Sequence, residues 1–115
     1  DLDYGLWYMD AMNDPAKYEG KTVKIKGMVY RGKNFPEDDF VPGRFGMVCC
    51  ADDVTFIGFI CRSKQAKQLK QESWVTVTAK VAVEYYPQYR GDGPVLYATS
   101  IEPAEKPEEE LVYFN

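Results

Sequence analysis

Histidine is absent from all 115 residues of the sequence. Its absence excludes Ser-His-Asp and Cys-His nucleophile activation, histidine acid–base catalysis and every zinc site that mixes histidine with cysteine ligands. Neither common form of the glycine-rich phosphate loop is present. Because only carboxylates, lysines, tyrosines and cysteines remain for chemistry, we expect that the protein is not an enzyme.

Long apolar runs are also missing. No window reaches the roughly 18 apolar residues that a membrane-spanning helix requires, and no signal-peptide pattern opens the sequence. We therefore expect no direct membrane insertion by this segment. The chain starts at Asp1 without an initiator methionine, as we expect of a mature or excised piece of a longer protein.

Basic residues are in the minority, with 14 Lys and Arg against 18 Asp and Glu and a net charge of −4. The protein therefore has no overall cationic field to attract a nucleic-acid backbone, and nucleic-acid binding is disfavoured. One early stretch is locally basic, and we interpret it as a solvated surface of mixed charge. Its members are Lys17, Lys21, Lys24, Lys26, Arg31 and Lys33.

Hydrophobic residues make up 45% of the sequence and charged residues 28%, as in an ordinary globular protein. A chain of this length can bury one core without metal or disulfide support. We expect one domain, divided into an N-terminal helix at 1–14, a barrel at 22–103 and an acidic tail at 104–115.

The first half of the chain predicts a helix and a strand. Apolar residues recur at helical spacing up to Pro15, which ends the helix. Thr22–Tyr30 then alternates apolar and polar residues as a strand does, and Gly27 in its middle is typical of a bend or of a close approach by another backbone. Arg31–Gly43, with its prolines, glycines and acidic run, predicts a long loop.

The middle of the chain predicts a hairpin. Phe45–Ala51 and Val54–Cys61 are apolar runs separated by two aspartates, so a tight turn would pair Ala51 with Val54. Both faces of this hairpin are apolar, and a barrel interior can hide only one of them. We expect the N-terminal helix, which carries Leu6, Trp7 and Met9, to cover the second face, with a partner protein as the alternative.

The second half predicts a short helix at Arg62–Ser73, a long strand at Trp74–Tyr85, a turn, and a last strand at Val95–Ile101. The order after the N-terminal helix is β-β-β-α-β-β. This order favours a mainly β protein, a five-stranded OB-type barrel with the N-terminal helix packed on it. An α+β sandwich with an open sheet is the alternative.

The three cysteines offer the only soft metal ligands. Cys49, Cys50 and Asp52 form a candidate metal site, with zinc as the candidate ion. In the predicted hairpin register Cys61 faces Arg44 and lies about 17–20 Å from the other two cysteines, too far to share an ion or a disulfide. Adjacent cysteines also point to opposite faces of a strand, so we favour core packing over a metal or redox role and expect no cofactor.

Aromatic residues gather near the last turn and beside the long loop. OB-type barrels bind ligands on such ring platforms between their loops, although rings can equally plug the ends of a barrel. We take six residues together with the Arg31–Gly43 loop as the candidate ligand-binding surface. They are Arg44, Cys49, Cys50, Asp52, Tyr86 and Tyr89.

Several motifs together resemble a known family. They are Tyr18-x-Gly20-Lys21-x-Val23-x-Ile25-x-Gly27, Arg44-Phe45-x-Met47-x-Cys49-Cys50-Ala51-Asp52, Trp74-Val75-x-Val77 and Val112-Tyr113-Phe114. The chain resembles the C-terminal soluble domain of the YcgQ-like bacterial membrane proteins, described as permease subunits with a domain of unknown function. The resemblance spans nearly the whole chain, and its most specific element is the cysteine pair followed by an acidic residue.

The resemblance implies a non-enzymatic accessory or ligand-binding domain of a bacterial membrane permease system. Relatives carry N-terminal membrane helices and are paired with a second permease-like membrane protein, which would be the partner. The protein would then be membrane-associated, with its soluble domain on the extracytoplasmic side. Metal handling through Cys49, Cys50 and Asp52 is one alternative, and binding of an oligonucleotide or oligosaccharide is the other.

Overall fold

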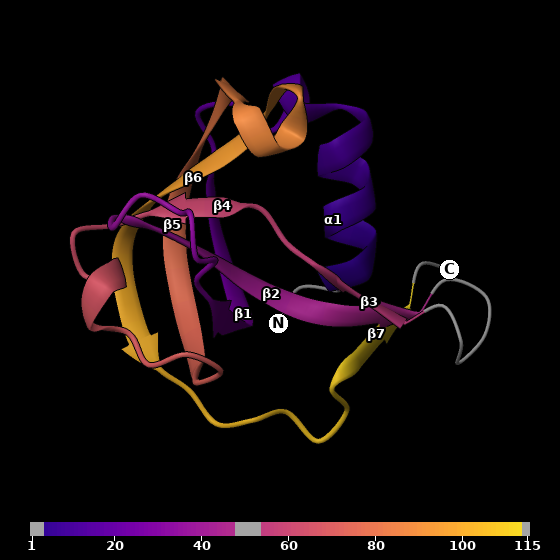
Figure 1. Ribbon diagram of the computed structural model, residues 1–115. Helices are drawn as coiled ribbons and strands as arrows, with labels where there is room; N and C mark the ends of the chain where they lie inside the picture. The colour runs from indigo at the N-terminus through magenta and orange to yellow at the C-terminus, as the bar shows by residue number, and fades with distance from the viewer. Residues whose placement is uncertain (1–3, 48–53, 114–115) are drawn as a thin grey trace.

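The computed structural model describes residues 4–47 and 54–113 (Figure 1). The helical elements are α1 (Tyr4–Asn13), η1 (Pro15–Lys17), η3 (Ala66–Gln68) and η4 (Pro87–Tyr89), of which only α1 is an α-helix. The strands are β1 (Thr22–Tyr30), β2 (Asp39–Met47), β3 (Val54–Ile57), β4 (Ile60–Arg62), β5 (Trp74–Tyr86), β6 (Gly91–Pro103) and β7 (Leu111–Tyr113). No helix in these ranges has the length and apolar character that crossing a membrane requires.

Five strands close into a barrel in the order β1-β5-β6-β4-β2, and β2 pairs back onto β1. All neighbours are antiparallel except β4 and β6, which are parallel. Numbered along the chain, the barrel strands follow the closed order 1-4-5-3-2. The predicted mainly β, five-stranded OB-type barrel is therefore confirmed, and closure removes the free sheet edges of an open layer.

Alternation of apolar and polar residues positions β1 and β5. Ile25 and Val77 are register partners, and both are almost completely buried in the barrel core. The residues on either side of them point outward, as the period of two requires. Burial of each such side chain stabilises the fold by about 1.5–3 kcal/mol.

Gly27 lies where β1 and β2 come into close contact. A Cβ atom built on Gly27 would lie 2.5 Å from the carbonyl carbon of Pro42 and 2.7 Å from its oxygen. No side chain fits there, so the strand needs glycine at this position. The close backbone approach predicted from the sequence is thus present.

β2 is longer than its place in the barrel and continues into a small second sheet. Its first residues pair with β4, its middle pairs with β1, and Arg44–Met47 pairs with β3. The same end of β2 also pairs in parallel with β7, which lies within the acidic tail. Figure 1 shows this arm extending from the barrel beneath α1.

α1 covers the arm, as the sequence predicted, but with a different set of residues. Tyr4, Trp7 and Ala11 are buried in the main core, and the Trp7 ring meets Phe59 edge to face at 5.4 Å. The predicted contribution of Leu6 and Met9 is wrong, because both lie on the outer side of α1, where Leu6 is 48% exposed.

The predicted hairpin register is also wrong. Val54 pairs with Met47 rather than with Ala51, and residues 48–53 lie outside the described part of the chain. The predicted strand Val54–Cys61 is divided into β3 and β4. The division follows from Gly58 and Phe59: Gly58 packs closely against Val41, and the Phe59 side chain turns into the core under α1.

Two further expectations differ from the structure. β2 begins at Asp39, so the loop predicted at Arg31–Gly43 is shorter. The helix predicted at Arg62–Ser73 is only the single turn η3, and Arg62 belongs to β4. Backbone hydrogen bonds of 2.8 Å join Val29 to residues 72 and 73 in both directions, and they hold the end of this segment against β1.

Candidate functional site

A group of polar side chains meets on the outer face of the barrel. Asp39 comes from β2, Arg62 from β4, Glu84 and Tyr86 from β5, and Tyr97 from β6. The strand register aligns them, since Asp39 pairs with Arg62 and Arg62 pairs with Tyr97. We call these five residues the Arg62 cluster.

The guanidinium of Arg62 is held in one position by the rest of the cluster. Its Nε donates to Asp39 Oδ1 at 3.1 Å, and its Nη1 donates to Glu84 Oε1 at 3.2 Å and to the Tyr97 hydroxyl at 2.9 Å. The Tyr97 hydroxyl donates in turn to Glu84 Oε2 at 2.6 Å. The rings of Tyr86 and Tyr97 lie 5.8 and 5.7 Å from the guanidinium carbon, within cation–π range.

Asp39 is the buried member of the Arg62 cluster, with an exposed fraction of 1%. A buried carboxylate is costly unless it is paired and hydrogen-bonded. Arg62 supplies the opposite charge, and the Tyr86 hydroxyl donates to Asp39 Oδ2 at 2.7 Å. Arg62 itself keeps 35% of its side chain exposed, so the cluster presents a fixed cation to solvent.

The pKa values of the Arg62 cluster follow from these contacts. Burial raises the pKa of Tyr86 to about 12, and the hydrogen bond to Asp39 acts in the same direction. Burial opposes the charge of Arg62, but the Tyr97 bond and the Asp39 charge outweigh it, so the Arg62 pKa is raised. The bond to Glu84, followed by burial, raises the pKa of Tyr97. Arg62 therefore stays cationic, and both phenols stay protonated at neutral pH.

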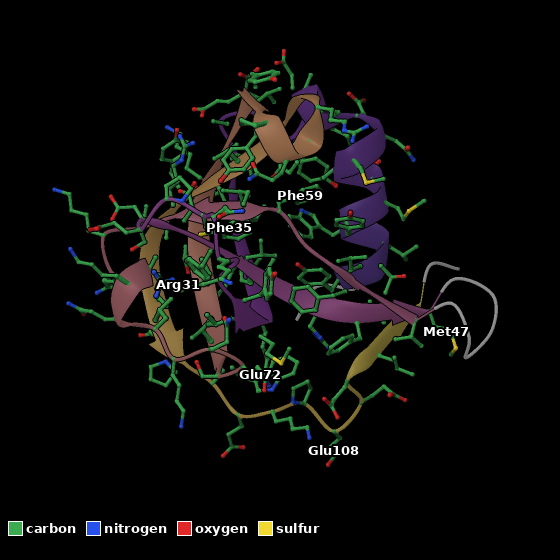
Figure 2. All side chains as sticks on the ribbon, in the orientation of Figure 1. Arg31, Phe35, Met47, Phe59, Glu72 and Glu108 are labelled. Atoms are coloured by element: carbon green, nitrogen blue, oxygen red, sulfur yellow. The ribbon has the colours of Figure 1, made fainter. Side chains whose placement is uncertain are left out.

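A small apolar cluster supports this face. Ile60, Tyr86 and Val95 are its buried members, and Phe35 and Tyr89 pack against it. Phe35, labelled in Figure 2, brings the loop between β1 and β2 onto the face. The Arg62 cluster thus lies on a packed apolar surface, and Tyr86 belongs to both groups.

Two of the predicted site residues lie at this face. Tyr86 belongs to the Arg62 cluster, whereas Tyr89 supports it from the side. The Tyr89 hydroxyl accepts from the Ile60 amide at 2.8 Å and donates to the Pro94 carbonyl at 2.7 Å. Burial raises the Tyr89 pKa, so this phenol stays protonated between its two partners.

Arg44, another predicted site residue, has entirely different surroundings. It is only 7% exposed, and its guanidinium lies 5.9 Å from the Tyr4 ring and 5.5 Å from the Trp74 ring. Its Nη2 donates to the Glu109 carbonyl at 3.2 Å, while its buried Nε has no hydrogen-bond partner among the described residues. Burial lowers the Arg44 pKa. Arg44 therefore joins α1, β5 and the tail instead of facing Tyr86.

The remaining predicted site and metal residues, Cys49, Cys50 and Asp52, lie outside the described residues. Cys61 is described, and its predicted pairing with Arg44 is wrong, because it pairs with Phe40 while Arg44 pairs with Ile57. Cys61 is completely buried, and burial raises the pKa of its thiol to about 12, so it packs as a small apolar residue. Within residues 4–47 and 54–113, no three His, Cys, Asp or Glu side chains are grouped to hold a metal ion.

Sequence reasoning missed four members of the Arg62 cluster. Asp39 was assigned to a loop and Arg62 to a helix, so neither had a predicted face. Glu84 and Tyr86 lie two residues apart on β5, so their side chains share its outer face. This spacing was the one signal for the cluster in the sequence. The cluster as a whole depends on barrel closure, which brings β2, β4, β5 and β6 together.

The Arg62 cluster has the chemistry of a recognition site. It offers one fixed guanidinium, two carboxylates and two phenols, all joined by hydrogen bonds in a single network. Such a preorganised polar network supplies geometric specificity to a partner that replaces solvent at its exposed edge.

Comparison with known proteins gives a family and two relatives. A family model described as the DUF1980 C-terminal domain matches residues 1–114. The UPF0703 protein YcgQ of Bacillus subtilis (strain 168) is 26% identical over 101 residues, which cover 88% of this chain and 35% of the relative. A Streptococcus mutans serotype c protein, named as a candidate subunit of a two-component membrane permease complex, is 26% identical over 110 residues, or 92% of this chain and 40% of the relative. These matches agree with the resemblance found in the sequence.

The chain thus spans less than half the length of either relative. Among solved structures, the aspartyl tRNA synthetase from Entamoeba histolytica is similar over 87% of this chain and 22% of that chain. The sequence identity is 17% and the TM-score 0.47, so this likeness carries no argument about function.

Proposed function

Because the chain belongs to the DUF1980 C-terminal domain family, we propose that it is a non-enzymatic accessory domain that binds a partner within a bacterial membrane permease system. The name of the Streptococcus mutans relative supports this proposal. According to this proposal, the domain is part of a membrane-associated protein, lies on the extracytoplasmic side of the membrane, and contacts a permease-like membrane protein.

We further propose that the Arg62 cluster is the surface that contacts this partner. The observation that carries the proposal is the state of Arg62, which is 35% exposed yet held by three side-chain partners between two tyrosine rings. Arginine and tyrosine are among the residue types that contribute most to protein–protein binding. A side chain that is already fixed also loses less conformational entropy on binding.

Charge favours a protein partner over an oligonucleotide. The cluster combines one guanidinium with the carboxylates of Asp39 and Glu84, so it would not track a row of phosphates. Of the two tyrosine rings in the cluster, only that of Tyr97 is exposed, so the face offers no row of rings on which successive bases could stack.

The zinc alternative gains no support from the described residues. Cys61 is a buried, protonated thiol that packs against the barrel core. The names of the two relatives refer to no metal. We therefore retain the binding-domain proposal.

Co-purification from membranes tests the proposal. The full-length protein that carries this domain would be co-expressed with its permease-like partner, solubilised in a non-ionic detergent and isolated through an affinity tag. Tyr97→Ala removes an exposed ring, and Arg62→Lys removes the guanidinium that bonds Asp39 and Glu84 through two different nitrogens. We expect each to weaken partner binding by about tenfold or more, corresponding to at least 1.4 kcal/mol.

Tyr85→Ala is the matched control, because Tyr85 is 65% exposed on β5, the strand that carries Glu84 and Tyr86, but lies outside the cluster. It should retain the partner at the wild-type level. Equal retention of the partner by the wild type and all three variants would contradict the proposed surface. Displacement of the partner by added single-stranded DNA would favour the oligonucleotide alternative.

A further inference from the structure

A cavity of about 340 Å³ lies between α1 and the last barrel turn. α1 contributes Tyr8 and Met12, the link between β3 and β4 contributes Phe59, and the turn around η4 contributes Tyr89 and Asp92. Figure 2 labels Phe59 between α1 and this turn. Three segments far apart in the sequence therefore form one binding-sized space.

Three aromatic rings, those of Tyr8, Phe59 and Tyr89, line the cavity. Tyr8 and Phe59 are stacked, with centroids 4.8 Å apart and an interplanar angle of 26°. Tyr89 is fixed by hydrogen bonds to Ile60 and Pro94, so its ring cannot leave the wall without breaking both. The faces of such rings carry partial negative charge and attract cations.

Asp92 is the one charged side chain in the described lining. No described lysine or arginine lines the cavity, and no hydrogen bond or ion pair joins the Asp92 carboxylate to another described residue. The charge that the described lining contributes is therefore a single negative one, on the exposed carboxylate of Asp92. A neutral apolar ligand would desolvate this carboxylate without compensating its charge, which is unfavourable.

We propose that this cavity binds a small organic cation, an ammonium or quaternary ammonium group on a short apolar body. The rings of Tyr8, Phe59 and Tyr89 hold the cationic group, and Asp92 balances its charge. Met12 lies at the rim, 52% exposed, and its flexible thioether packs on ligands of varied shape. The volume suits a molecule of this size.

Cation binding in the cavity does not depend on the proposed partner surface. The cavity uses none of the five residues of the Arg62 cluster, and Tyr89 is the one residue that both supports that face and lines the cavity. Partner binding and cation binding can therefore fail separately, and the two sets of experiments distinguish them.

Choline and 3,3-dimethylbutan-1-ol provide a matched pair of probes, because they share shape and differ in charge. Equilibrium dialysis of the full-length protein in a non-ionic detergent would measure the binding of each. We expect one choline per chain and binding of the neutral isostere weaker by about tenfold. Equal affinity for the two probes, or no saturable binding of choline at millimolar concentration, would overturn the proposal.

Two variants locate the binding. Asp92→Asn should weaken choline binding by about tenfold and leave the neutral isostere unchanged, whereas Glu105→Gln, an exposed carboxylate in the tail, should change neither. Tyr8→Leu should remove the preference for choline over its isostere. Tyr8→Leu also alters the contact of α1 with Phe59, so thermal unfolding would check that this variant keeps its fold. If its melting temperature falls, the choline affinity of Asp92→Asn alone decides the outcome. An Asp92→Asn protein that binds choline as tightly as the wild type would refute the site.

Discussion

Tyr86 donates its phenolic proton to the buried carboxylate of Asp39 across 2.7 Å, joining residues 47 positions apart in the chain. The bond links the end of β5 to the start of β2 on the outer face of the barrel. The bond supplies a donor to one carboxylate oxygen of Asp39, and the other oxygen accepts a hydrogen bond from Arg62. The geometry of the Arg62 cluster depends on this pair.

Tyr86→Phe removes the bond and leaves the ring. The Asp39 carboxylate then keeps only Arg62 as a partner in a site that water does not reach. We expect the free energy of unfolding to fall by about 1.5–3 kcal/mol, the usual range for a hydrogen bond to a charged group. Urea denaturation would measure the change, and Tyr85→Phe, on an exposed ring, should leave stability unaltered.

Stability should also depend on alkaline pH through Tyr86. Its pKa is raised from 10.0 in an unfolded chain to about 12, so folding favours the protonated phenol. The stabilising contribution is complete below pH 10 and is lost as the pH rises from 10 through 12. In denaturation curves across this window, the wild type should lose more stability than Tyr86→Phe. Parallel pH profiles for the two proteins would contradict a raised Tyr86 pKa in the folded state.

Gly27→Ala tests the closest contact of the barrel. The new Cβ would lie 2.5 Å from the Pro42 carbonyl carbon, so β1 and β2 would have to separate. We expect a loss of about 1–3 kcal/mol or more, measured by chemical denaturation. Gly91→Ala is the matched control, because no atom lies within 4 Å of a Cβ at Gly91, and its stability should stay within about 0.5 kcal/mol of the wild type.

The thiol of Cys61 should be unreactive in the native protein. It is completely buried, and its pKa is about 12, so neither access nor thiolate is available near neutral pH. In a Cys49→Ser, Cys50→Ser protein, Cys61 is the sole thiol, and a disulfide reagent such as Ellman's should react with it only after denaturant is added. Rapid labelling without denaturant would contradict its burial.

The parts of the fold that the sequence predicted are those that depend on local pattern. The alternation of β1 and β5 directs Ile25 and Val77 inward whatever the rest of the chain does. Pro15 prevents the continuation of α1, which ends at Asn13, whatever the tertiary environment. These elements, with their order, were sufficient to identify the barrel.

The parts that the sequence did not predict depend on distant contacts. Phe59 breaks the predicted strand because its ring packs under Trp7, and nothing in the run Val54–Cys61 signals that partner. Likewise, the predicted helix after β4 is replaced by backbone bonds to Val29. Arg62 gains its neighbours only when β4 is placed between β2 and β6 by closure of the barrel.

Site-specific photo-crosslinking in membranes tests the proposed function most directly. A photoreactive amino acid would replace Tyr97 in the full-length protein, and in a second protein it would replace Tyr85, which lies outside the Arg62 cluster. We expect an ultraviolet-dependent product of the combined mass of the protein and its permease-like partner from position 97 and not from position 85. A product from position 85 alone, or from neither position while the two proteins still co-purify, would contradict the proposed function.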